Sequence, residues 1–145
     1  IKFDKFEGHF AEWKNKMFDL ASKEYLFFID ADEMITKDII EDLPHILEYN
    51  NIDVLGIARE NLVEGLTDEW IKKWGWRIDE YNRVNFPDTQ IRVFFNSPNI
   101  RWQNKVHEIP TGYNTISVLP AEKYFLLHHK KLDKQIKQNE FYSSL

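Results

Sequence analysis

Apolar residues recur along the chain at the three- and four-residue spacing of amphipathic helices in two places. The first lies between residues 8 and 21, and its periodic positions are Phe10, Trp13, Met17, Leu20 and Ala21. The second begins after Thr36, a suitable N-cap, and continues to about Tyr49. Because Pro44 lies inside this second stripe, we expect a kink or two short helices.

An uninterrupted apolar run over residues 25–29 predicts a strand buried on both faces, as in the interior of a parallel sheet. The run ends abruptly at Asp30, Asp32 and Glu33. Ligands in open α/β sheets bind beyond the carboxyl ends of such strands. Because Asp30 and Asp32 are two residues apart, both carboxylates can reach one hard cation, with a phosphate behind it.

The rest of the pattern predicts strands and loops that end in a helix. Strands are expected at residues 53–59, 91–95, 100–102 and 124–127. A turn at 96–99 would join the second and third of these into a hairpin. Residues 60–88 are irregular and rich in Trp, Gly and charge, which indicates a long functional loop with some helix. Residues 132–142 predict a polar surface helix.

Length and composition narrow the class of protein. The chain has 145 residues, which is enough for one domain with a buried core. We expect this single domain to span residues 1–145. Its net charge of −5 argues against a nucleic-acid binder that relies on a basic surface. The absence of cysteine excludes a disulfide framework and a thiolate metal site. No apolar stretch reaches the ~18 residues of a spanning helix, so we expect a cytoplasmic protein, free or peripheral to a membrane.

The acidic turn has two other interpretations. A calcium loop counted from Asp30 places Asp38 and Glu41 at its ninth and twelfth positions. Such a loop needs an oxygen ligand at its fifth position and Gly at its sixth, where this chain has Met34 and Ile35, so a calcium loop is excluded. The other interpretation is a set of solvated carboxylates at the approach to a helix.

Two short motifs supply further candidates. Glu108, next to His107 and after the predicted hairpin, can serve as a general base beside a bound sugar, or the pair is a solvated strand end. His128 and His129 end the last predicted strand. Alternation turns one of the two inward, either as a ligand of Mn²⁺ or as a core histidine.

Aromatic and cationic side chains complete the candidate set. Three of the five tryptophans are grouped at Trp70, Trp74 and Trp76. Tryptophan rings stack on the apolar faces of sugars, although most aromatic residues belong to a core. Arg92 and Arg101 are candidates for phosphate binding, because a guanidinium contacts phosphate oxygens in a bidentate manner.

The ordered motifs resemble family 2 glycosyltransferases of the GT-A fold, in the branch that carries Val-His-Glu after a metal-binding Asp-x-Asp. The resemblance covers the chain from about Phe10 to Tyr142. It rests on Asp30-Ala31-Asp32-Glu33, Gln90-Ile91-Arg92-Val93-Phe94, Trp102, Val106-His107-Glu108 and the His128-His129 pair. This combination is more specific than Asp-x-Asp alone.

The resemblance implies a GT-A-like (Rossmann-related) mixed α/β sheet flanked by helices, here a partial domain. It implies that Asp30 and Asp32 hold Mn²⁺ or Mg²⁺ on the diphosphate of a nucleotide-sugar donor. In this family-based interpretation His128 completes the metal shell, Arg92 contacts the donor, and Glu33 helps to order the turn.

The same resemblance implies an inverting transfer. Glu108 would remove the proton of the acceptor hydroxyl, and His107 would shape the site around it. The acceptor would be a glycan, a lipid-linked molecule or a protein, and residues 60–88 are where we expect acceptor choice to lie. The sequence leaves the donor nucleotide and the sugar open.

Two departures from the family pattern bear on the prediction. Nothing before Phe10 supplies the strand, loop and Asp that grip the nucleotide, so the chain is expected to be a fragment or a degenerate remnant. Where the family often has Arg-Asn in its first helix, this chain has Lys14-Asn15. The alternative functions are a non-catalytic carbohydrate-binding remnant and a Mg²⁺-dependent phosphohydrolase, since paired aspartates also serve phosphoryl chemistry.

Overall fold

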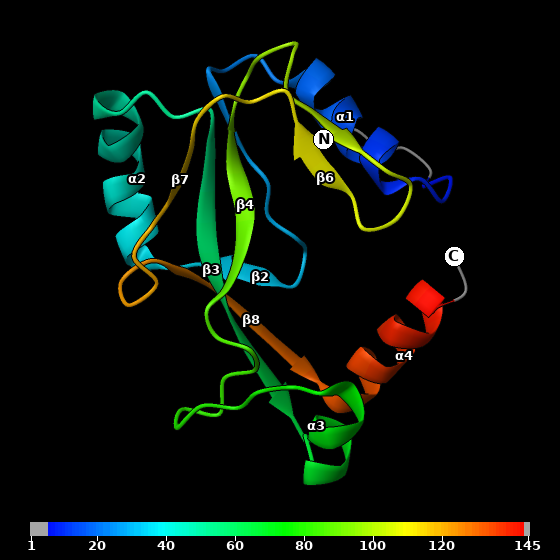
Figure 1. Ribbon diagram of the computed structural model, residues 1–145. Coiled ribbons are helices and arrows are strands. Elements are labelled where there is room, and N and C mark those ends of the chain that lie inside the picture. The colour runs from blue at the N-terminus through cyan, green and yellow to red at the C-terminus, as the bar shows by residue number, and fades with distance from the viewer. Residues whose placement is uncertain (1–5, 144–145) are drawn as a thin grey trace.

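Helices flank a mixed β-sheet in this chain (Figure 1). The structure is a computed structural model that describes residues 6–143, without the side chains of residues 142 and 143. The helices are α1 (Phe10–Leu20), α2 (Lys37–Tyr49), α3 (Asp68–Trp74) and α4 (Leu132–Ser143). The strands are β1 (Tyr25–Phe27), β2 (Glu33–Ile35), β3 (Val54–Glu64), β4 (Asp88–Phe95), β5 (Arg101–Gln103), β6 (Ile109–Thr111), β7 (Ile116–Val118) and β8 (Phe125–Lys131).

The main sheet has the strand order β1-β4-β3-β8-β2, and β7 also pairs with β3. Its pairings are mixed, because β3 is antiparallel to β4 and parallel to both β7 and β8. A separate two-stranded ribbon is formed by β5 and β6. The predicted fold class, a mixed α/β sheet flanked by helices as in a partial Rossmann-like domain, is confirmed.

β3 is the centre of the sheet, and its first half is buried on both faces. Val54, Leu55, Ile57 and Ala58 are all at most 1% exposed. Leu55 and Ile57 belong to a core that includes residues of α2, whereas Val54 belongs to a core that includes residues of α1. The sheet therefore separates two apolar cores, and the second half of β3 extends beyond them toward the polar residues of the site.

The strand predicted at residues 25–29 is shorter and differently placed than expected. β1 ends at Phe27, its residues are half-buried, and it pairs antiparallel with β4 at one edge of the sheet. The prediction of an interior parallel strand is wrong. Its apolar run has another cause, since Tyr25 and Phe27 pack on the α2-side core while Leu26 and Phe28 pack on the α1-side core.

The predicted hairpin between residues 91–95 and 100–102 is also wrong. β5 pairs antiparallel with β6 instead of with β4. Gly112, just after β6, allows this pairing, because its φ is +81° and an added Cβ would lie 1.9 Å from the carbonyl oxygen of Asn99. The β5–β6 ribbon carries the Val-His-Glu motif in its connecting loop.

Other predicted elements differ mainly in length. The predicted helices at 8–21 and 132–142 are confirmed as α1 and α4, while α2 is one helix despite Pro44. Pro44 has no N–H to donate to the carbonyl of Ile40, and the helix continues through this position. β3 and β8 are longer than predicted, so His128 and His129 lie inside a strand. Within residues 6–143 no helix is long and apolar enough to cross a membrane.

Candidate functional site

The acidic turn is held in shape by reciprocal bonds between Asp30 and Glu33. The backbone N–H of Asp30 donates to Oε2 of Glu33 at 3.0 Å, and the N–H of Glu33 donates to the carbonyl of Asp30 at 3.0 Å. The Glu33 side chain is fully buried, and burial raises its pKa, although Arg92 opposes this effect. Glu33 therefore orders the turn, as the resemblance implied.

Arg92 lies beneath the same turn. Its Nη2 donates to Oε1 of Glu33 and to Oδ2 of Asp30, the latter at 3.1 Å, and its side chain is 6% exposed. The Arg92 guanidinium thus forms ion pairs with two carboxylates of its own chain. A contact between Arg92 and a donor phosphate stays a prediction.

His128 faces Asp32 from β8, the strand next to β2. Its Nε2 lies 3.6 Å from Oδ2 of Asp32, and its Nδ1 lies 2.6 Å from Oδ1 of Asn61 on β3. An amide oxygen accepts hydrogen bonds, so Nδ1 carries the proton and Nε2 presents a lone pair to Asp32. Neutral imidazole with one nitrogen fixed in this way is the form that binds metals.

The orientation of Asn61 is itself fixed by Asp88. Nδ2 of Asn61 donates to Oδ2 of Asp88 at 2.8 Å, and the Arg59 guanidinium donates to the same oxygen through Nε at 3.0 Å and Nη2 at 2.7 Å. Burial lowers the pKa of His128 to about 4, with the positive charges of Arg59 and Lys130 adding to the effect. At neutral pH the imidazole is uncharged.

Asp32 also forms an ion pair with a lysine side chain. Nζ of Lys134, on α4, lies 3.0 Å from Oδ2 of Asp32. Burial alone would raise the pKa of Asp32, but this hydrogen bond and the charges of neighbouring basic residues bring it below its ordinary value. Asp32 is therefore ionised.

Glu108 is presented by the loop of the β5–β6 ribbon. Its Oε1 lies 2.5 Å from Nζ of Lys14 on α1, and both side chains are less than 20% exposed. The same ammonium lies 4.2 Å from the centre of the Trp102 ring. Lys14 thus holds the predicted base in one position.

Asn15, the residue after Lys14, fixes helix α1 to the β5–β6 ribbon. Nδ2 of Asn15 donates to the carbonyl of Trp102 at 2.9 Å, and the N–H of Trp102 donates to Oδ1 of Asn15 at 2.8 Å. The Lys14-Asn15 pair, noted as a departure in sequence, therefore connects α1 to the base and to β5.

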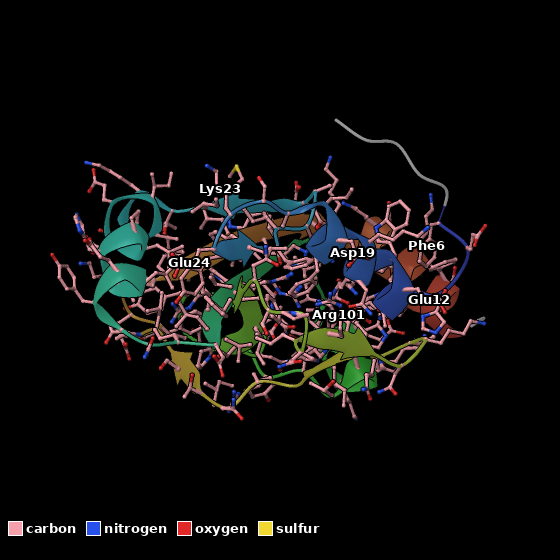
Figure 2. All side chains as sticks on the ribbon, turned by 90° about the horizontal axis from the view of Figure 1, so that it is seen from above. Phe6, Glu12, Asp19, Lys23, Glu24 and Arg101 are labelled. Atoms are coloured by element: carbon pink, nitrogen blue, oxygen red, sulfur yellow. The ribbon has the colours of Figure 1, made fainter. Side chains whose placement is uncertain are left out.

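One cleft brings the predicted residues together. It has a volume of about 510 Å³ and is lined by five of them, namely Asp30, Asp32, His107, Glu108 and His128. His129 lies on the other face of β8, with Nε2 3.7 Å from Glu60, as alternation predicted. Arg101 lies beside Asp19 on α1, with Nη2 3.4 Å from Oδ1 of Asp19 (Figure 2). Its Nη1 donates to the backbone carbonyls of Ser97 and Ile100.

Several residues of the site were missed in sequence. Lys14, Arg59, Gln90 and Gln138 also line the cleft. The sequence did contain a sign of Arg59. Arg59 and Asn61 are polar residues two positions apart that follow the apolar part of a strand, so both side chains point to the same face of the sheet. Lys134 and Gln138 gave no such signal, since a polar surface helix contains many similar residues.

The described residues contain no group of three or more His, Asp or Glu side chains arranged to hold a metal ion. They do contain a pair that suits one, because an ionised carboxylate and an unprotonated imidazole nitrogen face each other at 3.6 Å. Two acceptor atoms this close fit a divalent cation that takes its remaining ligands from other molecules, such as water.

Comparison with known proteins finds two curated relatives that are named glycosyltransferases. No protein-family model matches the chain. The chain is 28% identical over 117 residues to the SPbeta prophage-derived glycosyltransferase SunS of Bacillus subtilis (strain 168), and equally to glycosyltransferase SunS of Bacillus phage SPbeta. The match covers 79% of this chain and 23% of each relative, so the chain spans about a quarter of their length. This chain is thus a distant relative of a glycosyltransferase over most of its own residues.

Proposed function

We propose that this chain contains the metal-binding and acceptor-activating part of a glycosyltransferase, which moves a sugar from a nucleotide-sugar donor to an acceptor hydroxyl with inversion. The observation that carries the proposal is the single cleft shared by Asp32, His128 and Glu108. These residues come from distant parts of the chain. The relationship to SunS supports sugar transfer in general.

Asp32 and His128 would hold the cation, Mn²⁺ or Mg²⁺, with Asp30 at the edge of the same turn. The cation would offset the negative charge that develops on the leaving diphosphate. Arg92 and Glu33 contribute by fixing the turn that carries both aspartates. Asn61 contributes by keeping the lone pair of His128 directed at Asp32.

Glu108 would act as the general base. Its carboxylate takes the proton of the acceptor hydroxyl while that oxygen forms a bond to the anomeric carbon of the sugar. The bond between this carbon and the diphosphate oxygen breaks, and its electron pair leaves with the nucleoside diphosphate. Because the acceptor attacks from the face opposite the leaving group, the configuration inverts. Lys14 keeps the carboxylate at the wall of the cleft.

One feature of the cleft favours a second candidate function, a non-catalytic sugar-binding remnant. Each of its three carboxylates is paired with a cation of the chain: Asp30 with Arg92, Asp32 with Lys134 and Glu108 with Lys14. A catalyst must exchange at least the second of these pairs for a metal ion, whereas a remnant would keep all three.

Calorimetric titration with nucleoside diphosphates and nucleotide sugars, with and without Mn²⁺, tests the proposal. We expect metal-dependent binding that is lost in Asp32→Ala and kept in Asp38→Ala, an exposed carboxylate of α2. Nucleotide binding that is the same with and without Mn²⁺ and in Asp32→Ala would contradict the proposed function. Release of the free sugar or of phosphate without any acceptor would favour a hydrolase instead.

A further inference from the structure

A second cavity adjoins the catalytic cleft. It has a volume of about 280 Å³, just below the range of roughly 300–1,000 Å³ for small-molecule sites, so it suits a single ring better than an extended chain. Its lining comes from β3, β8, α4, the first residue of β4 and the segment between α3 and β4. Arg59, His128 and Gln138 line both the cavity and the cleft, so the two spaces share a wall.

Trp76 forms the aromatic part of the lining and is rigidly placed. Gly75, with φ +65°, ends α3, and the N–H of Trp76 donates back to the carbonyl of Ile71 at 3.0 Å. The Trp76 ring packs against Trp74 with their centres 4.5 Å apart, and Trp74 packs against Trp70 at 4.6 Å. A ring packed on one side against tilted aromatic neighbours offers its other surface at little entropic cost.

The loop that follows Trp76 is built against β3. The N–H of Val84 donates to the carbonyl of Asn61 at 2.8 Å, which fixes the loop on the sheet. Arg77 and Asn85 are joined by two bonds, from the N–H of Arg77 to Oδ1 of Asn85 and from the N–H of Asn85 to the carbonyl of Arg77, each 2.8–2.9 Å long. The wall formed by Val84 and Asn85 is therefore ordered before any ligand binds.

One of the two cations of the cavity is balanced by a carboxylate of the chain, and the other is held by an amide. Arg59 is paired with Asp88 at 2.7 Å, and Nζ of Lys130 donates to Oε1 of Gln138 at 2.7 Å. The rest of the polar lining is the His128 imidazole and amides, including those of Asn85 and Gln135. An aromatic surface beside amide groups and a lysine, all able to bond to hydroxyls, suits a ligand that has both hydroxyls and an apolar face.

We propose that this second cavity is a subsite for a pyranose ring, stacked on Trp76 and hydrogen-bonded by the surrounding amides. The inference rests on the proposed function and adds a substrate class to it, because a sugar bound here adjoins the shared residue His128. The ring could belong to the acceptor, which would then be a glycan, or to the sugar of the donor. Both sources present the same pyranose ring to the cavity. Competition between a glycoside and a nucleotide sugar distinguishes them.

The test follows the indole N–H signals of the protein by ¹⁵N NMR, with the Trp76 signal assigned from its absence in Trp76→Phe. The probes are the methyl glycosides of glucose, galactose, mannose and N-acetylglucosamine, and sorbitol is the control, since it has the hydroxyls without the ring. We expect at least one glycoside to shift the Trp76 signal saturably, and sorbitol to leave it unchanged. Failure of every glycoside to do so would overturn the inference.

Variants keep the test independent of folding defects. Trp76→Ala should weaken binding of that glycoside, measured by saturation-transfer NMR, by about tenfold, whereas Trp76→Phe, which keeps a ring, should retain most of it. Tyr81→Ala is the matched control, because Tyr81 is an aromatic residue of the same loop that is 66% exposed and does not line the cavity. Equal affinity in Trp76→Ala and the unchanged protein would overturn the inference.

Competition identifies the source of the ring and separates this inference from the proposed function. A glycoside that binds together with a nucleotide sugar marks an acceptor subsite, and one displaced by it marks the donor sugar; both outcomes support a pyranose subsite. Metal-dependent nucleotide binding without any glycoside effect at Trp76 overturns this inference alone. A glycoside effect without nucleotide binding overturns the proposed function and leaves the subsite standing.

Discussion

The Nε2 atom of His128 lies 3.6 Å from Oδ2 of Asp32, too far for a good hydrogen bond and close enough for one cation to contact both. The tautomer of His128 makes this relationship specific, since Asn61 requires the proton on Nδ1. A carboxylate and an imidazole lone pair that face each other repel unless a positive charge lies near them. In this structure Lys134 supplies that charge.

Lys134→Met is predicted to strengthen Mn²⁺ binding, because it removes the cation that competes for Asp32. The Lys134 side chain is 59% exposed, so the gain should be modest, about two- to fivefold. Titration of Mn²⁺ into the protein, followed by the relaxation of water protons, measures it. Lys137→Met, an exposed lysine of the same helix, is the control. Weaker Mn²⁺ binding in Lys134→Met would indicate that Lys134 helps to hold the ligand instead.

Glu108→Gln is predicted to lower the rate of sugar transfer by about 10²- to 10⁴-fold, the range typical for loss of a general base. Binding of the donor should stay unchanged, because Glu108 lies at the acceptor side of the cleft in the proposed reaction. Transfer is measured with a radiolabelled nucleotide sugar and donor binding by calorimetry. If Glu108→Gln abolished donor binding, its assignment as the base would be wrong.

Sequence reasoning selected residues that lie together in the structure, but it predicted the strand pairings around them less well. Asp30, Asp32, His107, Glu108 and His128 were predicted from local patterns, and the structure places all five in one cleft. Such residues can be found because each breaks an apolar run or belongs to a short motif. Their roles in metal binding and proton transfer stay predictions.

The strand pairings were harder to predict because they depend on contacts far apart in sequence. An apolar run is the same whether its strand is interior and parallel or, like β1, at an edge with both faces packed against cores. The partner of β5 depends on the approach of Gly112 to Asn99, which no local pattern reveals. Likewise Arg92, surrounded by apolar neighbours, gave no sign that Asp30 and Glu33 would occupy its guanidinium.

Stability at acid pH is predicted to depend on His128 in the metal-free protein. Its pKa is about 4 in the folded chain and about 6.5 when unfolded, so the unfolded state binds more protons between these values. Stability should therefore fall as pH drops from 6.5 toward 4, by roughly 3 kcal/mol from this group alone. Urea denaturation at several pH values gives the free energy of unfolding as a function of pH. Between pH 6.5 and 4 this free energy should change less with pH in His128→Gln than in His45→Gln, the control at an exposed site. Equal changes in the two variants would contradict the prediction.

Arg92→Met is predicted to destabilise the fold by about 3–5 kcal/mol, because it leaves the fully buried carboxylate of Glu33 without its main partner. Arg59, whose Nη1 is 3.6 Å from Oε1 of Glu33, compensates only in part. The double variant Arg92→Met with Glu33→Gln should recover part of the loss, since the buried charge is then gone. Urea denaturation measures all three proteins, with Arg77→Met, at an exposed arginine, as the control.

The same variants separate structural from functional roles of Arg92. If Arg92 acts only by fixing the acidic turn, Arg92→Met should weaken Mn²⁺ binding in the absence of any nucleotide, because Asp30 and Asp32 lose their fixed positions. If Arg92 instead moves to contact a donor phosphate, Mn²⁺ binding alone should be unchanged while nucleoside diphosphate binding weakens. The burial of the guanidinium between Asp30 and Glu33 favours the first outcome.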